Sequence, residues 1–115
     1  MEGDQYVETG GLHWGPILRG GFYCHWRASW PFAEITVSSS CIRITVNNWL
    51  VRPYTEIIEF EKAEVTVVRR RSGLLSAGAQ FEHLNADAPP TVVFWTSRRT
   101  GLFTELRRFG YNTLG

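Results

Sequence analysis

Alternation of apolar and polar residues, the pattern of β-strands with one buried face, runs through most of this chain. The clearest case is residues 41–46, in which three apolar side chains alternate with Arg43 and Thr45. The same period of two predicts further strands over residues 21–27, 33–37, 54–60, 64–70, 78–84 and 91–96. The pattern therefore predicts a protein built mainly from β-sheet.

One segment near the C-terminus follows a helical period instead. Leu102, Leu106 and Phe109 fall at positions i, i+4 and i+7, and Phe103 widens the apolar stripe. Residues at this spacing share one face of an α-helix. We expect this face to be buried and the helix to cover part of the sheet.

The ends of this helix also have recognisable signals. Ser97 or Thr100 is the expected N-cap. Arg107 and Arg108 lie in the last turn, where cations complement the negative end of the helix dipole, and Gly110 follows at a position that favours a left-handed residue. The helix is therefore expected to end near Phe109.

Glycine, proline, serine and asparagine residues divide the predicted elements. Residues 1–17 are rich in glycine and polar residues and predict an irregular N-terminal arm. A proline at residues 28–31 predicts a break between two strands, three serines at 38–40 predict a tight turn, and residues 49–51 are expected to pair briefly. Two prolines make residues 85–90 an open loop.

Together these elements predict one mainly β domain over residues 18–115, with one C-terminal helix. About seven antiparallel strands in succession favour a strongly bent sheet, in effect a split barrel with the helix capping one end. The chain has 115 residues, which suits one hydrophobic core but not two.

Charge and hydropathy limit the function classes. The twelve cations are nearly balanced by eleven acids, so the net charge of +1 makes a nucleic-acid partner unlikely and any basic site must be local. The start of the chain has no secretory-signal pattern, and no apolar run is long enough to cross a bilayer. We expect a cytoplasmic protein, with nothing in the sequence to support a membrane partner.

The sequence contains no recognisable metal-binding or catalytic motif. Cys24 and Cys41 do not form a CxxC pair, and His13, His25 and His83 lie in separate segments without metal-ligand spacing. Nucleotide-binding loops and nucleophile–base motifs are also absent from the sequence. We therefore expect no metal, no cofactor and no enzymatic activity.

The order of elements resembles a known family. Residues 76–96, SAGAQFEHLNADAPPTVVFWT, and the helix end RRFGY at residues 107–111 are similar to pleckstrin-homology-like domains of bacterial proteins of uncharacterised function. The resemblance spans about residues 20–111. It implies a binding fold, because eukaryotic relatives bind phosphoinositides, phosphotyrosine peptides, proline-rich peptides or other proteins, and bacterial members assemble or scaffold.

The phosphoinositide-binding members of that family carry several basic residues across their first two strands. The corresponding segment here, CHWRASWPFAEI at residues 24–35, has Arg27 as its one cation. This departure argues against inositol phosphate recognition through that segment. Trp26 and Trp30 in the same segment are candidates for an aromatic contact surface, with packing into the body as the alternative.

The candidate contact residues for an anion or an acidic partner are arginines: Arg69, Arg70, Arg71, Arg98 and Arg99. The alternative is a solvated rim in which the arginines pair with nearby acids, namely Glu56, Glu59, Glu61, Glu64 and Glu105. The sequence predicts a non-enzymatic binding or self-assembly module. Its partner is a protein or peptide, including a second copy of the chain, that adds a strand to an open edge of the sheet. Binding of an anionic lipid or phosphate ligand through an arginine rim, and an enzyme without a recognisable motif, are the alternatives.

Overall fold

The computed structural model describes residues 4–19, 22–47, 55–73 and 77–114. This part of the chain forms eight strands and one α-helix. The strands are β1 (Gln5–Arg19), β2 (Phe22–Ser38), β3 (Cys41–Asn47), β4 (Thr55–Glu61), β5 (Val65–Ser72), β6 (Ala77–His83), β7 (Thr91–Trp95) and β8 (Thr113–Leu114). Helix α1 (Arg99–Arg108) follows β7, and a 3₁₀ turn (Lys62–Glu64) joins β4 to β5. The prediction of a mainly β chain with one C-terminal helix is confirmed.

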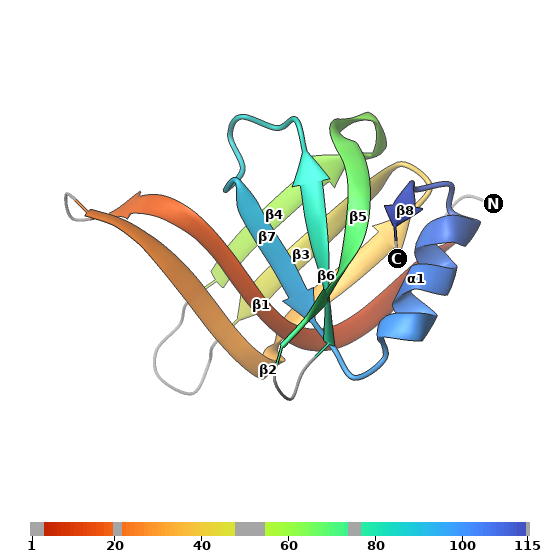
Figure 1. Ribbon diagram of the computed structural model, residues 1–115, viewed down its shortest axis with the longest axis horizontal. Helices are drawn as coiled ribbons and strands as arrows, with labels where there is room; N and C mark the ends of the chain where they lie inside the picture. Colours follow the sequence, from red (N-terminus) through yellow and green to blue (C-terminus); the bar gives the residue numbers. More distant parts are fainter. Residues whose placement is uncertain (1–3, 20–21, 48–54, 74–76, 115) are drawn as a thin grey trace.

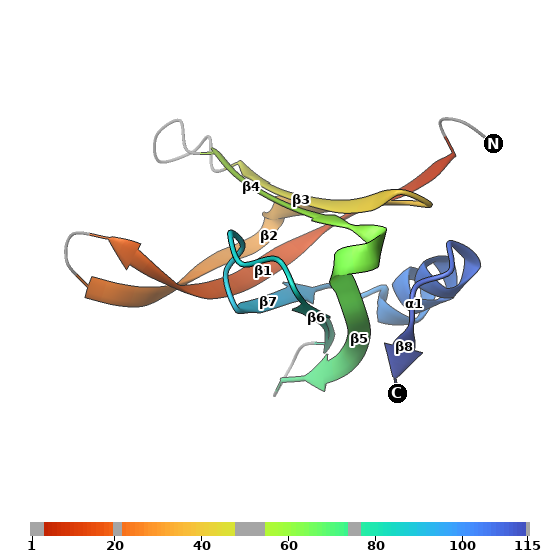
Figure 2. The ribbon, with the colours of Figure 1, turned by 90° about the horizontal axis from the view of Figure 1, so that it is seen from above.

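All eight strands belong to one sheet, in the order β4-β3-β2-β1-β7-β6-β5-β8. The pairs are antiparallel except for β5 and β8, which are parallel. The long strand β1 pairs with β2 and also, through Gly11–Gly15, with β7. The sheet is strongly bent, so that its two halves face each other with the core between them (Figures 1 and 2). The short strand β8 was not predicted, because two residues carry no recognisable alternation.

The predicted irregular arm at residues 1–17 is wrong for residues 5–17, which belong to β1. Leu12 and Trp14 are 1% exposed and lie in the core. The glycines that suggested a loose segment instead permit close packing. A Cβ on Gly10 would lie 2.3 Å from the carbonyl oxygen of Trp95, so only glycine fits there without a shift.

The predicted break at residues 28–31 is also wrong, because β2 continues through it. Ala28 pairs with Leu12 and Ala33 with Gly10, so the residues between them bulge opposite one residue of β1. Pro31 lies in this bulge, where its missing N–H removes no regular ladder bond. The other predicted strands are present to within about two residues, and residues 85–90 form the predicted loop. Residues 49–51 lie outside the described part.

Helix α1 closes one end of the bent sheet (Figure 1). Leu102, Phe103 and Leu106 are fully buried in the core, and Phe109 is nearly so, which confirms the predicted stripe. Burial of four large apolar side chains contributes on the order of 1.5–3 kcal/mol each to folding. The helix is therefore part of the core.

The predicted end of the helix is confirmed, but the predicted start is not. Arg108 is the last helical residue, and Gly110 adopts φ = 90° in the left-handed region. The N-cap is Arg98, not Ser97 or Thr100. The hydroxyl group at the start of the helix belongs to Thr96, one residue before Ser97. Its Oγ1 accepts a hydrogen bond from the N–H of Arg98 at 3.0 Å.

Candidate functional site

The outer face of the sheet carries a row of cross-strand partners on five strands, four of them polar and the fifth the buried Val93. Arg69, Gln80, Val93, His13 and Arg27 are successive cross-strand partners on β5, β6, β7, β1 and β2. Directly paired residues of antiparallel strands point to the same face. Core residues flank His13, Gln80 and Val93 along their strands, and Trp26 and Ala28 beside Arg27 pack against the core, so the row lies on the face opposite the core.

A second outward row lies beside the first. Arg71, Gly78 and Trp95 are cross-strand partners on β5, β6 and β7. A Cβ on Gly78 would lie 2.7 Å from Cε3 of Trp95, so the indole ring lies directly over this glycine. Trp95 is half-buried, and its ring forms an aromatic wall next to Arg71.

A cleft of about 460 Å³ opens between these rows and the bulge of β2. The described residues that line it include three that bear basic side chains, His13, Arg27 and Arg71, and none that bears a carboxylate. Ser29 and Ser72 add hydroxyl groups to the lining. Guanidinium groups and hydroxyls are hydrogen-bond donors, so the cleft is suited to an anion.

Three hydrogen bonds position Arg71 of the cleft and the neighbouring Arg99. Arg71 Nη1 donates to Oε1 of Gln80 at 2.8 Å, which uses one of the five N–H donors of the guanidinium. Arg99 Nη1, from the first turn of α1, donates to the carbonyl of Arg71 at 2.9 Å and to Oγ of Ser72 at 3.3 Å. Arg99 therefore brings a further positive charge to the rim of the cleft.

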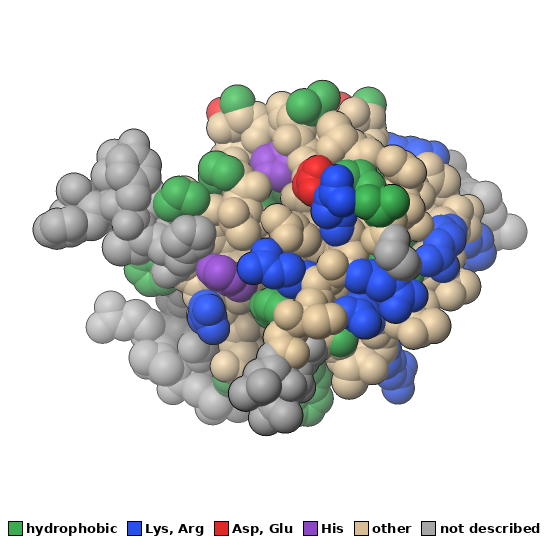
Figure 3. Space-filling view, viewed as in Figure 1, with side chains coloured by type: hydrophobic (Ala, Val, Ile, Leu, Met, Phe, Trp, Pro, Cys, Tyr) green, Lys and Arg blue, Asp and Glu red, His purple; other side chains and the backbone are tan. Residues whose placement is uncertain are grey.

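The basic character extends from the cleft over β5 and α1. In Figure 3, blue side chains spread over this face, with little red among them. Arg70 and Arg107 both lie over the ring of Phe103, with the guanidinium carbons 5.4 Å and 5.9 Å from its centroid. The two cations thereby cover an aromatic ring that also belongs to the core.

The predicted arginines are only partly brought together. Arg71 and Arg99 meet at the cleft. Arg69 shares the outer face but forms an ion pair with Glu82. Arg70 lies over Phe103 instead. Arg98 lies at a separate cleft of about 430 Å³.

The alternative prediction was a rim in which arginines pair with nearby acids, and Arg43 and Arg108 form such pairs. Glu59 pairs with Arg43 at 3.2 Å, and Glu105 pairs with Arg108 at 2.8 Å. Glu64 accepts a hydrogen bond from the backbone N–H of Glu61; the side chain of Glu56 lies outside the described part. Glu59 and Glu105 therefore pair with arginines other than the candidates.

The two candidate tryptophans have different environments. Trp26 is half-buried and packs against the core, as the packing alternative predicted. Trp30 is 69% exposed and lines the 430 Å³ cleft together with Arg98, Glu8 and Thr96. The two side chains do not form one aromatic surface.

We call the 460 Å³ cleft the basic cleft. The sequence analysis did not predict that three of its residues belong to a site: His13, Arg27 and Trp95. His13 was assigned to an irregular arm, although the alternation of Leu12, His13 and Trp14 is itself a strand signal. The pairing of His13 with Arg27 depends on the bulge in β2, which shifts the register; Pro31 marks this bulge in the sequence, but the sequence analysis interpreted it as a break between two strands.

Comparisons with known proteins do not identify the chain: no protein-family model, no curated protein and no solved structure matches it. Within the described ranges, no three His, Cys, Asp or Glu side chains gather as metal ligands would. The helical part of the described chain contains no segment with the length and apolar character needed to cross a membrane.

Proposed function

We propose that this chain is a non-enzymatic binding domain of pleckstrin-homology-like fold, and that its outer-face cleft binds a phosphate-bearing ligand. The observation that carries the proposal is that Arg27, Arg71 and His13 line one cleft. None of the described residues that line it bears a carboxylate. A ligand with two or more negative charges satisfies such a cleft better than water does.

The fold assignment rests on the sheet. The strand order ends with β4 on one side and with β5, extended only by the two-residue β8, on the other, and β4 and β5 do not pair in the described residues. Helix α1 covers one end. A split barrel with a C-terminal helix is the arrangement that the sequence resemblance implies.

The lining favours phosphate over a single carboxylate. Two arginines line the cleft from different strands, and Ser29 and Ser72 add two hydroxyls to the same lining. A phosphate offers acceptors in several directions, whereas one bidentate arginine satisfies a carboxylate.

Self-assembly through a free sheet edge, the first prediction from sequence, has less support and stays a prediction. The carbonyl of Arg71 on the β5 edge already accepts a bond from Arg99, and β8 pairs with Val68 and Arg69 on the same edge. A second copy would have to displace these contacts to add a strand there.

The test is titration calorimetry with inorganic phosphate, adenosine monophosphate and inositol trisphosphate, together with co-sedimentation on vesicles that contain a phosphoinositide. We expect at least one soluble phosphate ligand to bind, and to bind more weakly at high ionic strength. Preference among the arms separates a nucleotide from a lipid headgroup. Substitutions Arg27→Gln and Arg71→Gln should each weaken binding about tenfold, the loss of one charge-assisted contact.

Arg43→Gln is the matched control, because it removes the same charge from an arginine that pairs with Glu59 on another part of the sheet. Its affinity should equal that of the unsubstituted chain. Equal affinity of Arg27→Gln, Arg71→Gln and Arg43→Gln, or no binding of any phosphate ligand up to about 1 mM, would overturn the proposal.

A further inference from the structure

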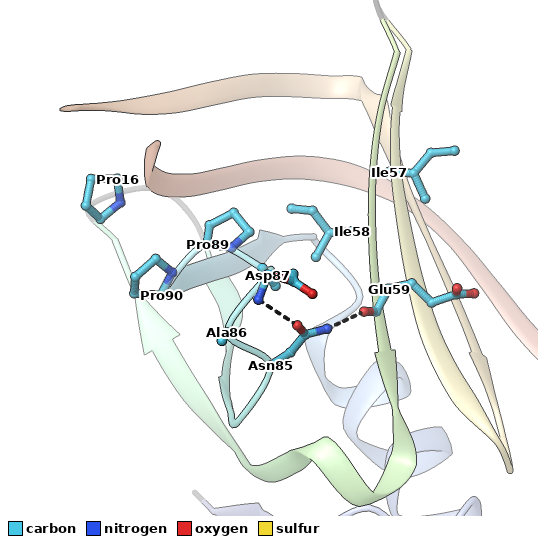
Figure 4. A pocket seen from close by; sticks show the side chains of 10 residues that line it. Pro16, Ile57, Ile58, Glu59, Asn85, Ala86, Asp87, Pro89 and Pro90 are labelled. Carbon is cyan, nitrogen blue, oxygen red and sulfur yellow. Dashed lines mark hydrogen bonds between the residues drawn. The ribbon is translucent and has the colours of Figure 1, made fainter. Parts of the chain in front are cut away.

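A second cleft, of about 550 Å³, lies on a different part of the molecule, along the edge of the sheet at β4. One wall is β4, which pairs with β3 on one side and has no strand on the other in the described part of the chain. The opposite wall is the loop of residues 85–90, with Pro16 at one end (Figure 4). This cleft is separate from the basic cleft and shares no residue with it.

The backbone of β4 presents hydrogen-bonding groups to this cleft. The side-chain amide of Asn85 donates to the carbonyl oxygen of Glu59 at 3.4 Å (Figure 4), so this carbonyl faces away from β3. Outward-facing residues alternate along an antiparallel strand, and the N–H and C=O of Ile57 therefore face the same edge. Among the described residues, no backbone group bonds to Ile57 across that edge.

The opposite wall is held in a fixed shape. His83 Nδ1 accepts a hydrogen bond from the N–H of Asn85 at 3.1 Å, and its Nε2 donates to the carbonyl of Pro89 at 2.8 Å. The ring of His83 packs on Phe60 of β4, with centroids 4.4 Å apart. The loop therefore keeps its place beside β4, with the cleft between them.

The side chains of β4 give the cleft an apolar floor. Ile58 points into the cleft, whereas Ile57 and Glu59 point away from it (Figure 4). Pro89 and Pro90 have no N–H to offer to β4, and the N–H groups of Asp87 and Ala88 bond to Asn85 within the loop. Asn85 makes the contact with the β4 backbone.

These features favour a thin, linear occupant. Because the second wall belongs to the same chain, an occupant must lie between β4 and residues 85–90, which favours one isolated extended segment over the edge of a folded domain. Such a segment would pair its backbone with Ile57 as an added strand.

The charge of the residues that line the cleft indicates which side chains the bound segment should carry. The ionisable residues of the lining are Glu59 and Asp87, both acidic, and no cation lines the cleft among the described residues. Glu59 is paired with Arg43, which leaves Asp87 as the acid that a ligand would meet. We infer that the β4 edge binds a linear peptide in extended conformation, with alternating apolar and basic residues.

The test uses a capped hexapeptide of alternating valine and lysine, its counterpart with glutamate in place of lysine, and amide resonances of the whole chain. We expect the lysine peptide to bind and to protect the Ile57 amide from hydrogen exchange, because that N–H gains an acceptor. The glutamate peptide should bind at least tenfold more weakly, since Asp87 repels it.

Ile57→Pro removes the outward N–H at an edge position where proline is tolerated, and Ile57→Val is the matched control that keeps it. Binding should be lost in the first variant and kept in the second. Asp87→Lys provides an independent test: it should weaken the lysine peptide at least tenfold without touching the β4 backbone.

Unchanged binding in both Ile57→Pro and Asp87→Lys would overturn the inference, as would equal affinity for the two peptides or no binding up to about 1 mM. Light scattering that shows a dimer lost in Ile57→Pro would also overturn it, because a second copy would then be the occupant. Substitution Arg27→Gln should leave peptide binding unchanged, so this result does not depend on the proposed phosphate site.

Discussion

The hydroxyl of Thr96 donates a hydrogen bond to the carboxylate of Glu8, and this bond joins residues 88 positions apart in the sequence. Both side chains are less than a tenth exposed. Tyr6 donates to the other oxygen of Glu8, and the N–H of Arg98 donates to Thr96. The network connects the start of β1, the end of β7 and the start of α1.

Thr96→Val removes the hydroxyl at nearly constant volume and should destabilise the fold by about 1–3 kcal/mol, because it leaves a buried carboxylate oxygen without its donor. Urea unfolding measures the loss. Thr9→Val, an exposed position on β1, is the control and should change stability by less than about 0.5 kcal/mol. Equal stability of the two variants would show that the bond to Glu8 contributes nothing.

Local periodicity was sufficient to predict most elements of this fold. The helix stripe at Leu102 and Leu106 and the alternation in β3 each depend on neighbours within a few residues. The cleft depends on the pairing of His13 with Arg27 and on the path of β1 across β7, which are set by a bulge and by close packing at Gly10. Such long-range register leaves no local pattern, so the sequence predicted most of the strands, with β1 and β8 as exceptions, but not the cleft.

Glycine at two positions should respond to alanine with opposite signs. Gly10→Ala places a methyl group 2.3 Å from the Trp95 carbonyl, and the required shift should cost on the order of 1–3 kcal/mol. At Gly101 of α1 the nearest atom to a new Cβ is the Tyr6 hydroxyl at 3.7 Å, so alanine fits and should stabilise the helix by up to about 1 kcal/mol. Thermal unfolding compares the two. A stabilised Gly10→Ala variant would contradict the close approach of β1 and β7.

Leu106→Asp should unfold the domain, because it places a charge at a fully buried core position and a small domain has only about 5–15 kcal/mol of net stability. Circular dichroism reports the loss. Thr104→Asp introduces the same charge on the exposed side of α1 and should leave the fold intact. A folded Leu106→Asp variant with an unchanged melting temperature would mean that α1 is not docked on the sheet.

Tyr111 should make the fold less stable at alkaline pH. Burial raises the pKa of its phenol from 10.0 to about 12, with the charge of Cys41 as a smaller cause. The hydroxyl also donates to the carbonyl of Ser38 at 2.8 Å. Because the folded pKa lies above the unfolded one, the stabilisation is complete below about pH 10 and is lost as the pH rises from 10 to 12. Urea unfolding across this range should show a smaller decline for Tyr111→Phe, which has no proton to lose. That variant should also be about 1 kcal/mol less stable at neutral pH, since the bond to Ser38 is gone.

The pKa of Tyr6 is raised as well, by burial and by Glu8, so part of the alkaline decline should remain in Tyr111→Phe and disappear only when Tyr6→Phe is added. An alkaline decline as steep in the double variant as in the unsubstituted chain would mean that other groups cause it.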